Sequence, residues 1–276
     1  SPMQLRDVVL SRTIVLQPNA IYSASDVQQS YNELMSLGCL RNVKVGFDRT
    51  EEPHSFVTYL GTDNNNAKKF VDIKEKYLDC NIYCTPALQQ GIKAELEAST
   101  TSSFYGLKAV VGYQNRNIFR GAEMLEVTGT AGYEYMKAPN SKKRHAMEFG
   151  VAAGLSFPRF LLANYALSNN ILVPKTKFEV SYNYQDRPYY QRGLSSISWI
   201  YSWRNRTNSS FVVRPIGINL VDVSYIDQNY FNSLQNQYLK HSFESQLILA
   251  LSGSYVYNKQ YKSAPNNRTT VRVNGE

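Results

Sequence analysis

After residue 90 the chain alternates between apolar and polar residues at successive positions, in one segment after another. Since a β-strand directs successive side chains to opposite faces, each alternating segment predicts a strand with one apolar and one polar face. The clearest segments are 92–98, 107–113, 125–135, 149–157, 178–184, 197–203 and 247–257. In all, the pattern predicts eight strands, with a ninth beginning at 269–273.

Alternation of this kind is found both in soluble β-sandwiches and in transmembrane β-barrels. Three features favour a barrel. Strands of about ten residues match a tilted bilayer crossing, whereas strands of globular proteins average about five or six. Polar links such as 137–144 and a longer insertion at 230–243 alternate with tighter links. Aromatic residues gather near strand ends, as at membrane interfaces: Tyr133, Tyr135, Phe157, Phe160, Tyr182, Tyr184, Tyr255 and Tyr257.

Residues 1–87 have a different, mixed α and β pattern. The β-branched run at 13–16 predicts a short strand that ends at a Pro-Asn turn. Ser25 and Asp26 are expected to cap a helix with apolar residues at helical spacing, and Gly38 stands where such a helix ends. This region therefore contains at least one helix that can pack on a small sheet.

Two alternating segments in the same region, 41–48 and 78–84, predict the strands of that sheet, and residues 62–69 predict a polar loop. Cys80 and Cys84 share one face of the second strand with apolar neighbours, so we expect them in the core. They are separated by about 13 Å along a strand that rises about 3.3 Å per residue, too far for a disulfide bond.

Charge and composition narrow the classes of protein further. The chain has 30 Lys and Arg against 22 Asp and Glu, but the basic residues come singly or in one short cluster at 142–144. This pattern does not favour nucleic-acid binding. The chain contains no run of about 18 apolar residues, so the sequence predicts no transmembrane helix. Three isolated histidines and three cysteines form no metal-binding or disulfide pattern, so we expect no metal and no cofactor.

A polar, glycine-containing segment links the second and third strands after residue 90. Considered by itself, it is a solvated turn with a local ion pair worth at most about 1 kcal/mol. It resembles closely the first inward turn of the BamA/TamA outer-membrane assembly superfamily, in which N-R-N-x-F-x-G-x-E follows the second barrel strand. The matching residues are Asn115, Arg116, Asn117, Phe119, Arg120, Gly121 and Glu123.

The residues ahead of these strands resemble the same superfamily. Segments 17–23, 31–38 and 43–45 are similar to its last polypeptide-transport-associated (POTRA) domain, which has the pattern P-G-x-x-Y-S, then a helix with L-x-x-L-G, then a strand. Asn19 replaces the usual Gly, and Asn also tolerates positive φ. One such domain directly before the barrel is the family order, and the strand end at Thr85-Pro86 is similar to the TamA/TamL branch.

The resemblance implies a mainly β protein in the outer membrane of a Gram-negative bacterium. Residues 1–87 would form a POTRA-like periplasmic domain that lacks its first strand, and residues 88–276 the N-terminal part of an incomplete transmembrane β-barrel. The implied function is insertion of outer-membrane proteins or translocation of polypeptides, with no catalytic residue. The implied partners are the lipid bilayer, nascent outer-membrane proteins, and periplasmic or outer-membrane accessory proteins.

In this superfamily the first barrel strand, here 91–100, is a weakly paired edge that offers its backbone to an incoming strand. The expected seam with a client strand consists of Gly91, Ile92, Ala94, Leu96 and Ala98. The POTRA-like domain would bind extended segments at a second edge that contains Val43, Val45 and Phe47. The alternative is that these three residues only form the core of their own domain.

Two other kinds of protein share the alternating pattern. A passive porin or uptake barrel would have the strands but would lack the POTRA-like region. A soluble β-sandwich that binds or hydrolyses carbohydrate would use its Tyr and Trp side chains as a sugar platform. A hydrolase would need a close carboxylate pair, and only Asp222 and Asp227 are near each other, on either side of a strand end.

Overall fold

The computed structural model describes residues 5–49, 55–62, 68–74, 78–136, 145–161, 171–205, 209–234, 240–261 and 264–275 of the 276-residue chain. The fold is mainly β, as the alternation predicts, and it contains one nine-stranded antiparallel sheet and two small two-stranded sheets. Among the described residues, no helix is long and apolar enough to cross a membrane.

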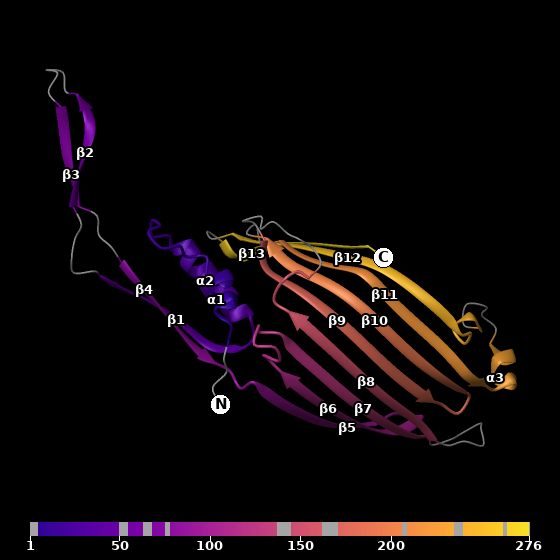
Figure 1. The fold of residues 1–276 in the computed structure, drawn as a ribbon. Helices are drawn as coiled ribbons and strands as arrows, with labels where there is room; N and C mark the ends of the chain where they lie inside the picture. The colour runs from indigo at the N-terminus through magenta and orange to yellow at the C-terminus, as the bar shows by residue number, and fades with distance from the viewer. Residues whose placement is uncertain are drawn as a thin grey trace.

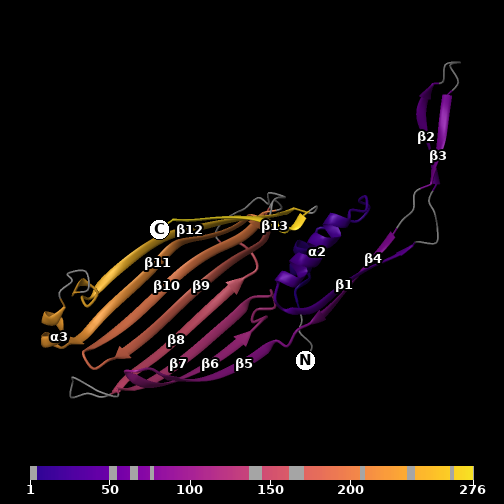
Figure 2. The same ribbon diagram turned by 180° about the vertical axis from the view of Figure 1, so that it is seen from behind.

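The N-terminal part consists of two helices, a two-stranded sheet and a separate hairpin. The sheet pairs β1 with β4 antiparallel, and the hairpin pairs β2 with β3. Figures 1 and 2 show that the hairpin extends away from the remaining structure, whereas the helices lie beside one end of the large sheet. The elements are α1 (Asp7–Thr13), α2 (Ala24–Ser36), β1 (Leu40–Arg49), β2 (Ser55–Thr62), β3 (Lys68–Lys74) and β4 (Leu78–Pro86).

Local signals position α2. The side chain of Ser23, rather than Ser25 or Asp26, caps the helix by accepting a hydrogen bond from the Asp26 N–H at 3.4 Å. Gly38 follows the helix with φ +72°, a left-handed conformation that glycine adopts without strain. The predicted end of the helix is therefore confirmed, and its predicted start moves by two to three residues.

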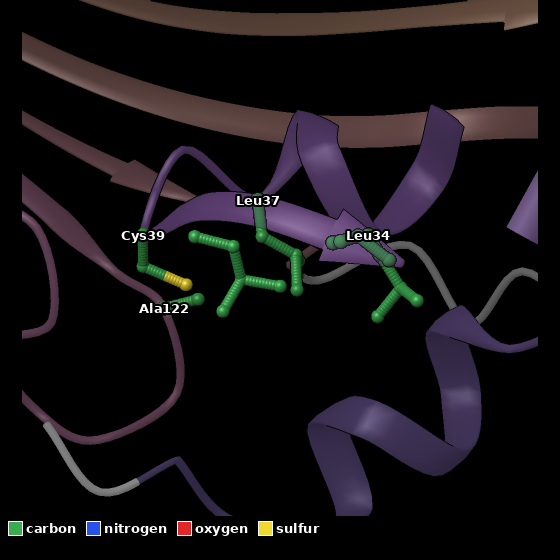
Figure 3. Packing of buried hydrophobic residues seen from close by; sticks show 6 residues of the cluster. Leu34, Leu37, Cys39 and Ala122 are labelled. Carbon is green, nitrogen blue, oxygen red and sulfur yellow. The ribbon is translucent and has the colours of Figure 1, made fainter. Parts of the chain in front are cut away.

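A small apolar core holds α2 against β1. Leu34 of the helix, Leu37 at its C-cap, Cys39 of the turn, and Leu40 and Val43 of the strand are all buried. Ala122, which comes from the large sheet's first long turn, is part of the same cluster (Figure 3). Burial raises the pKa of the Cys39 thiol to about 11.

Three predictions for this region are wrong or incomplete. Residues 13–16 form no strand: Thr13 ends α1, and Val15 donates its N–H to the Ser30 hydroxyl of α2 at 3.0 Å. Cys80 and Cys84 are exposed: the helical layer packs mainly on β1, and Ile82 is the residue through which their strand contacts the core. Thr62, Lys68 and Lys69 belong to the hairpin strands; the centre of the predicted loop, 63–67, lies outside the described residues.

The nine-stranded sheet runs in sequence order from β5 to β13, so each strand pairs with its neighbours in the chain. Figure 1 shows it as a curved wall, with α1 and α2 beside one end and α3 (Gln228–Ser233) at the opposite end. Its strands are β5 (Gln90–Thr100), β6 (Phe104–Asn115), β7 (Met124–Met136), β8 (His145–Phe157), β9 (Ile171–Asp186), β10 (Tyr190–Asn205), β11 (Ser209–Ile226), β12 (Gln246–Tyr261) and β13 (Ala264–Gly275).

The strand register sorts the side chains of the sheet into two faces. One in-register row across eight strands is entirely apolar or aromatic: Ile92, Tyr113, Val127, Ala153, Val180, Ile197, Ile218 and Leu249. The row one residue further along is polar or small until its last member: Lys93, Gly112, Thr128, Ala152, Ser181, Ser196, Asn219 and Ile248. We refer to the surfaces that contain these rows as the apolar face and the polar face.

The cysteines provide a test of the N-terminal packing. At pH 8 we expect Cys39 to react with a water-soluble disulfide reagent at least about tenfold more slowly than Cys80, because its thiol is buried and its raised pKa leaves little thiolate. Single-cysteine variants, made by replacing the other two with Ser, allow the rates to be measured separately. Equal rates would show that the core is open.

Candidate functional site

Most of the apolar face is not covered by other described residues; the exception is the end near Thr176, which lies beneath the link after β8. Ile92 is 80% exposed, Val180 53% and Leu249 71%. Neither two-stranded sheet packs against the nine-stranded one. Exposed apolar patches on soluble monomers are usually limited to a few hundred Å², so a continuous apolar row across eight strands marks an interaction surface.

Aromatic rings form a belt on the apolar face, at the end of the sheet where β8 and β10 finish. Successive ring centroids lie between 5.0 and 6.2 Å apart. Such edge-to-face and offset contacts stabilise aromatic pairs. In order of contact, the belt consists of Phe157, Phe178, Trp199, Tyr201, Phe160, Trp203, Phe211 and Tyr255.

The link after β8 fastens the belt to the sheet. Thr176 of β9 is completely buried beneath it: its hydroxyl donates to the Arg159 carbonyl at 2.8 Å and accepts from the Leu161 N–H at 3.0 Å. The Tyr201 hydroxyl donates to the Leu161 carbonyl. Phe160, between these backbone contacts, therefore packs in a fixed position in the belt.

A second aromatic group lies at the opposite end of the sheet, around α3. Tyr189 stacks on Tyr230 with centroids 4.7 Å apart, and Phe243 contacts both Tyr190 and Tyr230. The Asp227 carboxylate caps α3 by accepting from two backbone N–H groups, so its role is structural. Aromatic residues thus occur at both ends of the sheet, with mainly aliphatic residues between them.

The polar face carries ion pairs, both within a strand and between the link after β9 and the strands β7 and β8. Lys177 Nζ lies 2.6 Å from Glu179 Oε1. At the other end, the Arg187 guanidinium pairs with Glu134 and lies 3.7 Å from Glu148 Oε2. These groups are all partly exposed, so each pair contributes at most about 1 kcal/mol. The face as a whole is suited to contact with water.

The first strand of the sheet, β5, is an edge. It pairs with β6 along its whole length, from Gln90 opposite Asn115 to Thr100 opposite Tyr105, and its other side has no pairing partner among the described strands. Gly91 and the four apolar seam residues lie on this strand, and Leu96 is 73% exposed. The structure therefore brings the seam residues together on one open edge.

The structure places the residues of the turn motif, Asn115–Glu123, in two environments. Asn115, Asn117, Gly121 and Glu123 are buried, whereas Phe119 and Arg120 are exposed and Arg116 is intermediate. A simply solvated turn, the alternative considered from the sequence, does not account for this burial.

Internal hydrogen bonds fix the shape of the turn. The Asn117 side-chain oxygen accepts from the Ala122 N–H at 3.0 Å, and the Glu123 carboxylate accepts from the Gly121 N–H at 2.8 Å. Arg120 and Ala122 both have positive φ, near +60°, which is uncommon for residues other than glycine. A side chain at Gly121 would collide with the Glu123 carboxylate. A larger residue there would have to displace the carboxylate that accepts the Gly121 N–H.

The three residues of the expected POTRA edge lie on β1. Val43 is buried in the core and Val45 packs against it, while the Phe47 ring contacts Tyr22 at 5.2 Å. Because β1 pairs only with β4 among the described strands, its other backbone edge is open. The side chains thus serve the domain's core, and only the backbone of this edge is free for pairing.

The carboxylates and metal-ligating residues of the described parts of the chain do not come together in a metal site. No group of three or more His, Cys, Asp or Glu is placed to hold a metal ion there. Asp222 accepts a hydrogen bond from Ser245 at 3.4 Å, and neighbouring Asp227 caps α3.

Comparison with known proteins does not assign the chain to a class. No protein-family model matches it, and no curated protein matches it closely enough to count as a relative.

The turn motif provides a second prediction. Replacing Asn117 by Ala leaves the buried Ala122 N–H without its acceptor, so we expect a loss of about 1–3 kcal/mol in unfolding free energy. The substitution Phe119→Ala, in the same turn but at an exposed side chain, should change it by less than about 0.5 kcal/mol. Urea titration of both variants in detergent measures the difference, and equal losses would contradict the geometry of the turn.

Proposed function

We propose that the chain is part of an outer-membrane protein that inserts β-barrel proteins or translocates polypeptides, by offering the open edge of β5 as a template for client strands. The apolar face would contact lipid, the polar face would face an aqueous interior, and the N-terminal domain would lie in the periplasm and bind clients. The observation on which this proposal mainly rests is the exposed apolar face of the sheet.

The dimensions of the sheet agree with a bilayer crossing. The strands contain 11 to 18 residues. At about 3.3 Å per residue, the shortest is about 36 Å long, and a tilt of 45° leaves a vertical span of about 26 Å. The apolar band of outer-membrane barrels is about 25 Å tall, with aromatic residues at both margins. The aromatic belt and the aromatic group around α3 lie at the two ends of the sheet, which supports this comparison.

Templating follows from the hydrogen-bond requirement of backbone in lipid. A client strand cannot leave its N–H and C=O groups unpaired there, since each unsatisfied group costs several kcal/mol. The free side of β5, an eleven-residue strand, presents the backbone N–H and C=O groups of alternate residues for pairing. The resemblance of the turn Asn115–Glu123 to the assembly superfamily supports the same function, because that turn directly follows the strand that pairs with β5.

The two alternatives are less well supported. A soluble sandwich would pack the apolar face on a second sheet, and none lies there in the described parts of the chain. A passive pore would also have a polar inner face with ion pairs, but it gives no role to the N-terminal α+β region or to an open first strand.

A matched pair of substitutions tests whether the apolar face contacts lipid. Val180 and Ser181 are neighbours in the middle of β9 and belong to opposite faces. We expect Val180→Arg to lower the folding free energy in phosphatidylcholine vesicles by about 2–4 kcal/mol, and Ser181→Arg to have a much smaller effect. Urea titration with tryptophan emission measures both. Similar effects for the two variants would contradict the assignment of the faces.

Cysteine crosslinking tests templating directly. In a background with Cys80 and Cys84 replaced by Ser, cysteines at Ile92, Ala94, Leu96 or Ala98 should form disulfides with a stalled outer-membrane protein that carries cysteines along its strands. Val151→Cys is the matched control: it is exposed on the apolar face but lies in β8, which is paired on both sides. Crosslinks at the control and none on β5 would reject the seam.

A further inference from the structure

The turn motif contacts more than its own strands. The main-chain N–H of Arg6, at the start of α1, donates to the Arg120 carbonyl at 3.0 Å. The Ala122 methyl, 3% exposed, completes the core that α2 and β1 form with Leu34 and Cys39 (Figure 3). One short turn of the large sheet therefore provides both a hydrogen bond and a core side chain to the N-terminal domain.

The same turn also holds the linker Ala87–Gln89, which connects β4 to β5. Arg116 makes two contacts with it: its main-chain N–H donates to the Gln89 carbonyl and its guanidinium donates to the Leu88 carbonyl, each at 2.8 Å. In return, the Gln89 side chain donates to the Asn117 carbonyl at 3.3 Å. The Ala87 N–H donates to the Cys39 carbonyl at 2.9 Å. The linker is thus fixed on both sides immediately before β5 begins.

We infer that the turn Asn115–Glu123 is a joint that fixes the N-terminal domain to the sheet and clamps the base of β5 through Arg116. A displacement of the N-terminal domain would pull on the linker and on the turn together, and both lead directly into the first strand pair. On the proposed function, on which this consequence rests, binding of a client to the N-terminal domain would change how firmly the base of β5 is held.

The conformation of the turn supports a joint over a simple connection. A link between two antiparallel strands needs only two to five residues, but this turn is longer, keeps two non-glycine residues at positive φ, and buries a carboxylate. Strained backbone persists where surrounding contacts over-determine it. Here those contacts include the N-terminal domain and the linker. Arg116 and Ala122 are accordingly the positioning residues.

Undocking of the domain is the first test. Ala122→Asp places a charge in the core contact, and Asp tolerates the left-handed conformation at this position. Phe119→Asp adds the same charge to the same turn at an exposed side chain. Spin labels at Gln28 on α2 and Val151 on β8, in a background in which Cys39, Cys80 and Cys84 are all replaced by Ala, report the separation by electron–electron resonance. We expect a distance distribution at least about twofold broader for Ala122→Asp than for Phe119→Asp; equal widths would overturn the joint.

Clamping of β5 is the second test, and it does not depend on whether Ala122→Asp folds normally. Arg116→Ala should accelerate hydrogen exchange at residues 87–93 by about fivefold to tenfold, because the loss of one hydrogen bond favours local opening. Exchange in β9 to β11 should not change, and Arg116→Lys should restore part of the protection. The matched control is Arg192→Ala, which removes an arginine hydrogen bond to Gln185 at the opposite end of the sheet.

The outcomes separate this inference from the proposed function, since neither measurement uses a client. Unchanged exchange at 87–93 in Arg116→Ala, or equal acceleration in Arg192→Ala, would overturn the clamp. Faster exchange confined to 87–93 would support it, even if β5 formed no crosslinks to a client. In that case the templating function would fail while the joint remained.

Discussion

An antiparallel sheet with one apolar face must cover that face, and in this protein the described residues leave most of it uncovered. The row from Ile92 to Leu249 crosses eight strands without meeting a second layer. Burial of apolar surface is the main favourable term in folding, so a sheet of this kind is stable only against a partner as large and as apolar as itself. On the proposed function, a lipid bilayer meets that requirement and the opposite, polar face lines an aqueous interior.

The same constraint gives the edge strands their importance. In an apolar medium every backbone group needs a partner, and a sheet leaves groups unpaired only at its first and last strands. Within the described sheet these are β5 and β13. The N-terminal domain joins the sheet at β5 and is held there by the turn Asn115–Glu123. If the proposed function is correct, client binding and strand templating are therefore adjacent in space, and one short turn connects them.

Each strand of the sheet has one apolar face, so apolar residues recur at every second position of the sequence. That alternation is what predicts the sheet. The prediction was least complete at β11, where the pattern marked no clear strand. Its register shifts against both neighbours between Val213 and Gly217, which resets the alternation at Pro215. The N-terminal errors have a different cause. The β-branched neighbours of Thr13 predict a strand, but Thr13 ends a helix. Alternation places Cys80 and Cys84 on an apolar face, but whether a helix covers that part of the strand depends on tertiary packing.

The joint could not be predicted from the sequence for the same reason. Asn117, Gly121 and Glu123 were recognised by their order in the motif, but that order does not indicate that Ala122 enters another domain's core. Burial of a polar turn depends on contacts between residues that are distant in the chain, such as Arg6 with Arg120. Periodicity describes one element at a time, so it predicts the two faces of the sheet and leaves the docking of domains undetermined.

The most direct measurement of the central claim is the accessibility of single spin labels along β7, from residue 127 to residue 133, in the protein reconstituted into bilayers. β7 is paired on both sides, so its labels report the two faces without edge effects. The account predicts that labels at Val127, Gly129, Ala131 and Tyr133 collide mainly with oxygen dissolved in lipid, and that labels at 128, 130 and 132 collide mainly with a water-soluble nickel complex. Absence of this two-residue period, or odd positions shielded from both reagents, would contradict a lipid-facing sheet.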